Sequence, residues 1–165
     1  MRPVRTIIIG IGNPVLSDDA VGLRVAAQLR EAVDGSPEVA VTELCAGGIR
    51  LVEAMAGYER AILVDAIQTQ GGKPGSVYAL DPADMAPTRN IFSTHEGSLD
   101  VALELGRMIG LRVPDEIRIW GVEAADVATF GESLTTEVAR AVPRVVNGLI
   151  SYLGLEGPVA QETNA

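Results

Sequence analysis

The chain has 165 residues, with 13 Lys and Arg against 22 Asp and Glu, for a formal net charge of −9. Hydrophobic residues make up 47% of it, which excludes an intrinsically disordered chain and is enough to build one core. The negative charge argues against nucleic acid or an anionic membrane as the main partner. The single cysteine, Cys45, excludes an internal disulfide and any multi-cysteine metal site, and it suggests a reducing compartment.

The chain begins with a strand and a helix. Residues 4–10 (VRTIIIG) form a β-branched run that is typical of a strand buried on both faces. A Gly-rich turn ends the run, and Ser17 is the predicted N-cap of the helix that follows. Asp18 and Asp19 then lie in the first helical turn, where the helix dipole favours acidic side chains.

Two more strands follow around a second helix. Residues 39–44 alternate in polarity as a strand, and Gly47 and Gly48 open the helix after it. Residues 61–67 (AILVDAI) predict a third strand that is buried on both faces. Asp65 lies near the carboxyl end of this apolar run, where an unpaired carboxylate is costly to bury.

The second half of the chain continues the alternation. Residues 76–80 predict a short strand, and residues 95–110 predict a helix that Thr94 can cap. Residues 116–122 (EIRIWGV) alternate as the last strand. The final apolar helical pattern starts after Thr135, its predicted cap.

This order of elements predicts an α/β fold. We expect a three-layer sandwich, with an open, twisted, mostly parallel sheet of about five strands and helices on both faces. Residues 1–155 are predicted to form a single domain, and residues 156–165 a disordered tail. No apolar stretch approaches the roughly 20 residues of a membrane span, and the short apolar run at the N-terminus does not fit a signal sequence. We therefore expect a cytoplasmic protein with no membrane partner.

Three polar features fall where open α/β sheets bind ligands, beyond the carboxyl ends of the strands. They are the acids after the first strand, Asp65, and the only histidine, His95. The start of a helix disfavours imidazolium, so His95 would stay neutral, which is the form that binds metals. Asp19, Asp65 and His95 together could hold a transition ion such as zinc or nickel, with coordination positions left open.

Other interpretations remain for these features. Asp18 and Asp19 could serve only to balance the helix dipole, and Asp65 could form a structural salt bridge. Gly10 and Gly12 suggest a dinucleotide-binding turn, which is the weakest of the functional hypotheses. The third glycine is missing there and two acids would repel a pyrophosphate, so we expect no nucleotide.

Four segments together resemble the nickel–iron hydrogenase maturation endopeptidases. Residues 9–22 (IGIGNPVLSDDAVG) resemble the N-terminal motif of that family, residues 63–66 (LVDA) its third strand, and residues 93–95 (STH) its histidine segment. The Gly-Val-Glu of residues 121–123, followed by residues 134–143, is similar to the C-terminal signature. In this order and spacing, the resemblance covers about residues 5–153.

The resemblance implies a specific activity. Members of the family are endopeptidases, here expected to be of aspartyl type, that remove a short C-terminal extension from the large-subunit precursor after nickel has been inserted. The acid–acid–histidine site of the family maps onto Asp19, Asp65 and His95. The resemblance implies that these residues contact nickel that the substrate supplies.

The resemblance also implies which residues meet the substrate peptide, namely Asn13, Gly47 and Gly48. The general base cannot be read from the sequence, and Asp18 is a candidate only because it adjoins Asp19. The chain departs from many members in having Asp rather than Glu at position 19, and Ala-Gly-Gly-Ile rather than Asp-Gly-Gly-Thr at positions 46–49. The alternative is a non-catalytic chaperone that uses the same ligands to check the precursor for nickel without cutting it.

Overall fold

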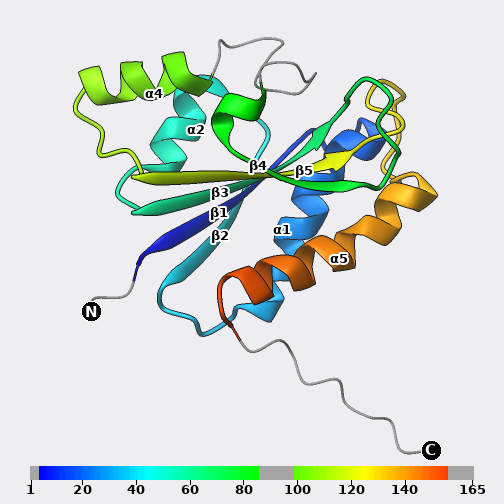
Figure 1. Ribbon diagram of the computed structural model, residues 1–165, viewed down its shortest axis with the longest axis horizontal. Coiled ribbons are helices and arrows are strands. Elements are labelled where there is room, and N and C mark those ends of the chain that lie inside the picture. Colours follow the sequence, from blue (N-terminus) through cyan, green and yellow to red (C-terminus); the bar gives the residue numbers. More distant parts are fainter. Residues whose placement is uncertain (1–3, 86–98, 156–165) are drawn as a thin grey trace, which may run out of the picture.

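A computed structural model describes residues 4–85 and 99–155, whose strands form one sheet (Figure 1). The strands are β1 (Thr6–Ile11), β2 (Val39–Leu44), β3 (Arg60–Ile67), β4 (Val77–Leu80) and β5 (Glu116–Glu123). The helices are α1 (Val21–Ala32), α2 (Gly48–Met55), α4 (Leu99–Met108) and α5 (Thr136–Tyr152), with short 3₁₀ helices η1 (Ser17–Ala20) and η2 (Pro82–Met85).

The strands lie in the order β2-β1-β3-β5-β4. The first four are parallel to one another, and β4 pairs antiparallel with β5 at one edge. β1 and β3 are buried along almost their whole length, whereas the edge strands β2 and β4 are half-buried. The β-branched runs of the central strands thus fit a position that is covered on both faces.

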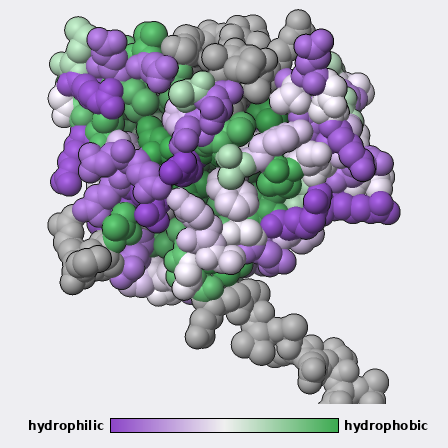
Figure 2. Space-filling view, in the orientation of Figure 1, coloured by the Kyte–Doolittle hydropathy of each residue, from purple (hydrophilic) through white to green (hydrophobic). Residues whose placement is uncertain are grey.

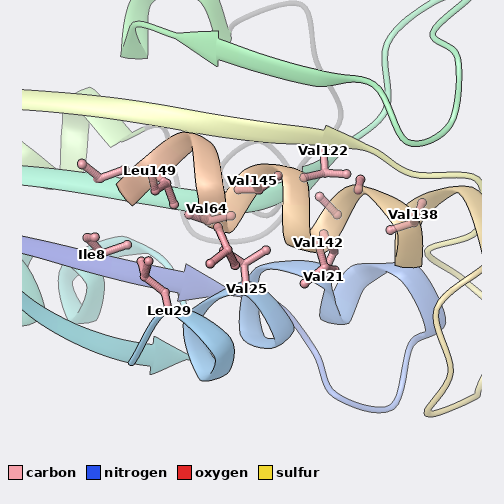
Figure 3. Close-up of a cluster of buried hydrophobic side chains, with 14 of the residues drawn as sticks. Ile8, Val21, Val25, Leu29, Val64, Val122, Val138, Val142, Val145 and Leu149 are labelled. Carbon is pink, nitrogen blue, oxygen red and sulfur yellow. The ribbon is translucent and has the colours of Figure 1, made fainter. Parts of the chain in front are cut away.

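Helices cover both faces of the sheet and enclose two hydrophobic cores. On one face α1 packs against α5, where valines and leucines of both helices meet the sheet (Figure 3). On the other face α2 packs against α4 around Leu51, Met55 and Leu103. The predicted three-layer α/β sandwich with five strands is therefore confirmed.

The local chemistry at two helix starts differs from the prediction. Ser17 does not cap α1, because the chain first forms η1 and the Ser17 hydroxyl donates instead to the carbonyl oxygen of Ser133, at 3.2 Å. Thr135 does stand at the N-cap of α5, but its hydroxyl donates to Asp18 rather than capping the helix. Both side chains connect η1 to the segment between β5 and α5.

The surface of the described residues is mixed. Figure 2 shows hydrophilic side chains around one face of the molecule, with apolar side chains between them. Within residues 4–85 and 99–155, no helix is long and apolar enough to cross a membrane.

Candidate functional site

The strand order changes direction between β1 and β3. From β1 the chain passes through α1 to β2 on one side, and then through α2 to β3 on the other side of β1. In open parallel sheets, such a switch point leaves a crevice beyond the carboxyl ends of the two strands. The loop after β1 and the end of β3 therefore flank the expected binding position.

Glycines let α1 lie directly against this end of the sheet. A Cβ at Gly22 would overlap the carbonyl oxygens of Ile11 and Val64. A Cβ at Gly12 would likewise overlap the carbonyl oxygen of Asp19. The close packing brings the first turn of α1 against the ends of β1 and β3, and it brings η1 against β3 and against Gly12, which follows β1.

Asp19 lies in η1, half-buried at this edge. Its Oδ2 accepts a hydrogen bond from the backbone N–H of Asn13, at 3.0 Å, which closes the loop after β1. Burial raises the pKa of the Asp19 carboxyl above its usual value, and the bond from Asn13 opposes that rise. A cation held nearby would offset the burial, because an opposite charge favours the ionised carboxylate.

Asp65 is fully buried near the carboxyl end of β3. Its Oδ1 accepts the backbone N–H of Ala66 at 2.9 Å. The alternation along the strand places Asp65 on the same face as Leu63 and Ile67, which belong to the core under α2 and α4. Asp65 adjoins Val64, whose carbonyl contacts the first turn of α1, so the structure brings Asp19 and Asp65 to the same edge of the sheet.

His95 lies outside the described residues, four positions before α4 begins at Leu99. Across residues 4–85 and 99–155, no three His, Cys, Asp or Glu side chains group closely enough to hold a metal ion. The site of Asp19, Asp65 and His95 is thus represented by its two acids, and its full composition stays a prediction.

Asp18 adjoins Asp19 but points into the protein. Its carboxylate is fully buried and accepts the backbone N–H groups of Ala125 (2.9 Å), Asp126 (3.0 Å) and Thr135 (2.7 Å), and the hydroxyl of Thr135 (2.9 Å). Both carboxylate oxygens of Asp18 therefore accept hydrogen bonds from the protein itself, four in all. This arrangement argues against Asp18 as the general base and indicates that it fastens η1 to the segment after β5.

The residues expected to meet the substrate lie at the same edge. Asn13 shapes its own loop, since its Oδ1 accepts the N–H of Val15 at 3.1 Å while its backbone N–H donates to Asp19. Gly47 and Gly48 follow the neighbouring strand β2, and Gly48 has φ +58° at the start of α2, a conformation that favours glycine. Their contact with a peptide remains a prediction.

A further buried acid, Glu123, was not among the predicted site residues. It ends β5, and its carboxylate accepts the N–H and the hydroxyl of Thr69 at 2.8 and 2.9 Å. Gly72 leaves room for this carboxylate, because a Cβ there would overlap it. Like Asp65, it is an acid near the carboxyl end of a strand, but β5 also contains Glu116 and Arg118, so Glu123 is less conspicuous in the sequence. Because Thr69 donates two hydrogen bonds to this carboxylate, we assign Glu123 a structural role.

A cleft of about 430 Å³ lies at the opposite end of the strands, at their amino ends. Thr6 and Arg60, at the amino ends of β1 and β3, line it together with Leu153 after α5. It is separated by the length of the strands from Asp19 and Asp65, and it contains no pair of acids among its lining residues. The carboxyl edge is therefore the better candidate for chemistry, since its two carboxylates could bind a cation or move a proton.

The chain is similar to proteins of one known family. A family model described as hydrogenase maturation protease matches residues 23–152. The hydrogenase 2 maturation protease of Escherichia coli strain K12 is 28% identical over 120 residues, which cover 72% of this chain and 73% of that protein.

Solved structures show the same fold. The nickel–iron hydrogenase maturation protease HycI from Thermococcus kodakarensis matches with a TM-score of 0.70 and 26% identity, covering 93% of this chain and 94% of that one. The hydrogenase maturating endopeptidase HybD from E. coli also has a TM-score of 0.70, with 23% identity over 91% and 92% of the two chains.

Proposed function

Since this chain belongs to the hydrogenase maturation protease family and is a peptidase, we propose that it removes the C-terminal extension of a nickel–iron hydrogenase large subunit. The precursor of that subunit is the substrate, and processing follows insertion of nickel. The observation that supports this most is the pair of acids at the switch-point edge, Asp19 in η1 and Asp65 at the end of β3.

In this proposal the protein recognises nickel that is already in the substrate. Asp19 and Asp65 offer carboxylate oxygens, and His95 would add an imidazole nitrogen, a donor set that suits nickel. The half-buried position of Asp19, which raises its pKa, favours a cation beside it. Binding the metal would fix the precursor so that its scissile peptide lies beside these side chains.

Hydrolysis then needs water and a group that moves a proton. A carboxylate at this edge accepts a proton from the attacking water while the oxygen bonds to the scissile carbonyl carbon. The same proton passes to the leaving amine when the C–N bond breaks. Asp18 is not assigned this step, because both its oxygens accept bonds from the protein. The proposal places the protein in the cytoplasm, the reducing compartment in which free thiols such as Cys45 are common.

The experiment is to incubate the wild-type protein with nickel-loaded and nickel-free large-subunit precursors and to measure the mass of the large subunit. We expect the loaded precursor to lose the mass of its extension and the nickel-free precursor to stay intact. Equal cleavage of both would refute recognition through nickel. Binding of the loaded precursor without any loss of mass would instead support the alternative, a chaperone that checks for nickel.

A further inference from the structure

The segment between β5 and α5 exposes one large apolar side chain. Phe130 is 83% exposed, the highest value among the large hydrophobic residues that the structure describes. Two other apolar residues of this segment, Val127 and Leu134, pack against the core between the sheet and α5. Phe130 thus lies at the surface, between two residues of the same segment that pack inward.

Hydrogen bonds hold this segment in place. Asp18 accepts the N–H groups of Ala125 and Asp126 at its start and that of Thr135 at its end. The side chain of Asp126 in turn accepts bonds within the loop, including the N–H of Thr129 at 2.9 Å. The loop therefore presents its aromatic ring from a fixed backbone, which reduces the conformational entropy that binding a partner would cost.

The same segment is joined to the connection between β1 and η1, the 3₁₀ helix that contains Asp19. Gly131 forms an isolated bridge with Leu16, in which its N–H donates to the carbonyl of Val15 at 3.0 Å and its carbonyl accepts the N–H of Ser17 at 2.9 Å. Val15, itself 43% exposed, precedes one bridged residue and Phe130 precedes the other. The two exposed apolar residues thus lie on adjacent backbones. Val15 is in the connection from β1 to η1, and Phe130 is in the segment bridged to it.

We propose that Val15 and Phe130 form a docking contact for an apolar residue of the large-subunit precursor, and that Phe130 is a specificity-determining residue. This inference rests on the proposed function. Two side chains are far too small for a stable dimer, which needs roughly 1,200 Å² or more of buried surface. They suit one aliphatic or aromatic residue of a polypeptide that has to reach Asp19, because Val15 lies in the connection that leads into η1, which contains Asp19, and Phe130 lies on the segment bridged to that connection.

The test measures precursor binding, and KM and kcat for removal of the extension, with the full chain and the nickel-loaded precursor. Phe130→Ser is expected to weaken binding and raise KM about ten-fold, because aromatic anchors dominate such contacts. The value of kcat should stay within about two-fold, since the ring docks the substrate away from the reacting bond. Phe130→Leu, which keeps an apolar side chain, is expected to retain most of the affinity.

Met108→Ser is the matched control. Met108 is 78% exposed and is the last residue of α4. Figure 1 shows α4 at the other side of the molecule from the loop after β5, so the Met108→Ser variant should bind and process the precursor like the wild type. Normal binding and KM for Phe130→Ser, a fall confined to its kcat, or an equal loss for Met108→Ser would each overturn the docking contact.

The binding measurement separates this inference from the activity. Wild-type protein that binds the precursor but leaves its extension in place would refute the proposed cleavage, and the ratio of Phe130→Ser to wild-type affinity would still decide the docking contact. Wild-type protein that binds no large-subunit precursor would overturn both.

Discussion

The carboxylates of Asp18 and Asp19 are adjacent in η1 but lie in different surroundings. Asp18 is fully buried among four donors, whereas Asp19 is half-buried and accepts a hydrogen bond from the backbone N–H of Asn13. A buried carboxylate whose donors would otherwise be left unpaired contributes strongly to folding. We therefore assign Asp18 to stability and Asp19 to the site.

This assignment predicts different effects for two isosteric variants. Asp18→Asn should lower the free energy of unfolding by about 2–3 kcal/mol. The NH₂ group of the amide would face N–H groups whose hydrogen bonds the carboxylate accepts, and these would be left unpaired. Asp19→Asn should change the free energy of unfolding little, since its oxygen can still accept the bond from Asn13. Urea unfolding of both variants measures the difference, and an equal loss in the two would contradict it.

The sequence identified Asp65 because an acid in an otherwise apolar strand is conspicuous, and the structure places it near the carboxyl end of that strand. The sequence could not distinguish the roles of Asp18 and Asp19, because the donors that bind Asp18 lie more than 100 residues away in the chain. The cap predicted at Ser17 failed for a related reason. Its hydroxyl bonds to Ser133, a distant residue that no local pattern reveals.

At the scale of elements, the contact of α1 with β1 and β3 depends on the absence of a side chain at Gly22. Gly22→Ala would push a methyl group into two carbonyl oxygens and should lower the free energy of unfolding by about 2–3 kcal/mol. Gly131→Ala is the control, since a Cβ there meets nothing within 4 Å. Denaturant unfolding that found the two variants equally stable would contradict this packing.

Arg60 and Glu116 form an ion pair at the amino ends of β3 and β5. Glu116 accepts a bond from Arg60 at 2.8 Å and one from the hydroxyl of Tyr152 at 3.1 Å. The bond from Arg60, above all, lowers the pKa of the Glu116 carboxyl. The folded state therefore favours the ionised form, and this stabilisation is present above the pKa of the unfolded chain and is lost as the pH falls through the folded pKa.

Glu116→Gln should accordingly be less stable than the wild type at pH 7, and the difference should shrink as the pH falls below about 4. Urea unfolding of both proteins across this range measures it. A difference that stays constant from pH 7 to pH 3 would show that the ionised Glu116 contributes nothing to stability.

The elements were predictable because their patterns are strong. β1 and β3 have apolar runs that fit burial on both faces, and every predicted strand is present, with β2 over the predicted residues. The direction of β4 was not predictable, since its short alternating sequence fits either direction at an edge. Its pairing is set by the chain turning back from β3 around residues 68–76, where Glu123 is bonded to Thr69.

At the scale of the whole molecule, the fold class followed from the alternation of strands and helices, but the strand order did not. The position of β1 between β2 and β3 creates the switch point, and this is what brings Asp19 and Asp65 to one edge. The order depends on which face each crossover helix covers, a choice made by the packing of α1 against α5 and of α2 against α4.

We propose that Asp19, Asp65 and His95 hold the substrate through its nickel. The measurement that tests this is the initial rate at which Asp65→Asn protein removes the extension from nickel-loaded precursor, compared with the wild type. The control is Asp34→Asn, because Asp34 is an exposed acid between α1 and β2, at the amino end of β2. We predict a fall of about 100-fold or more for Asp65→Asn and no change for Asp34→Asn. Folded Asp65→Asn protein that cleaves at the wild-type rate would contradict the site.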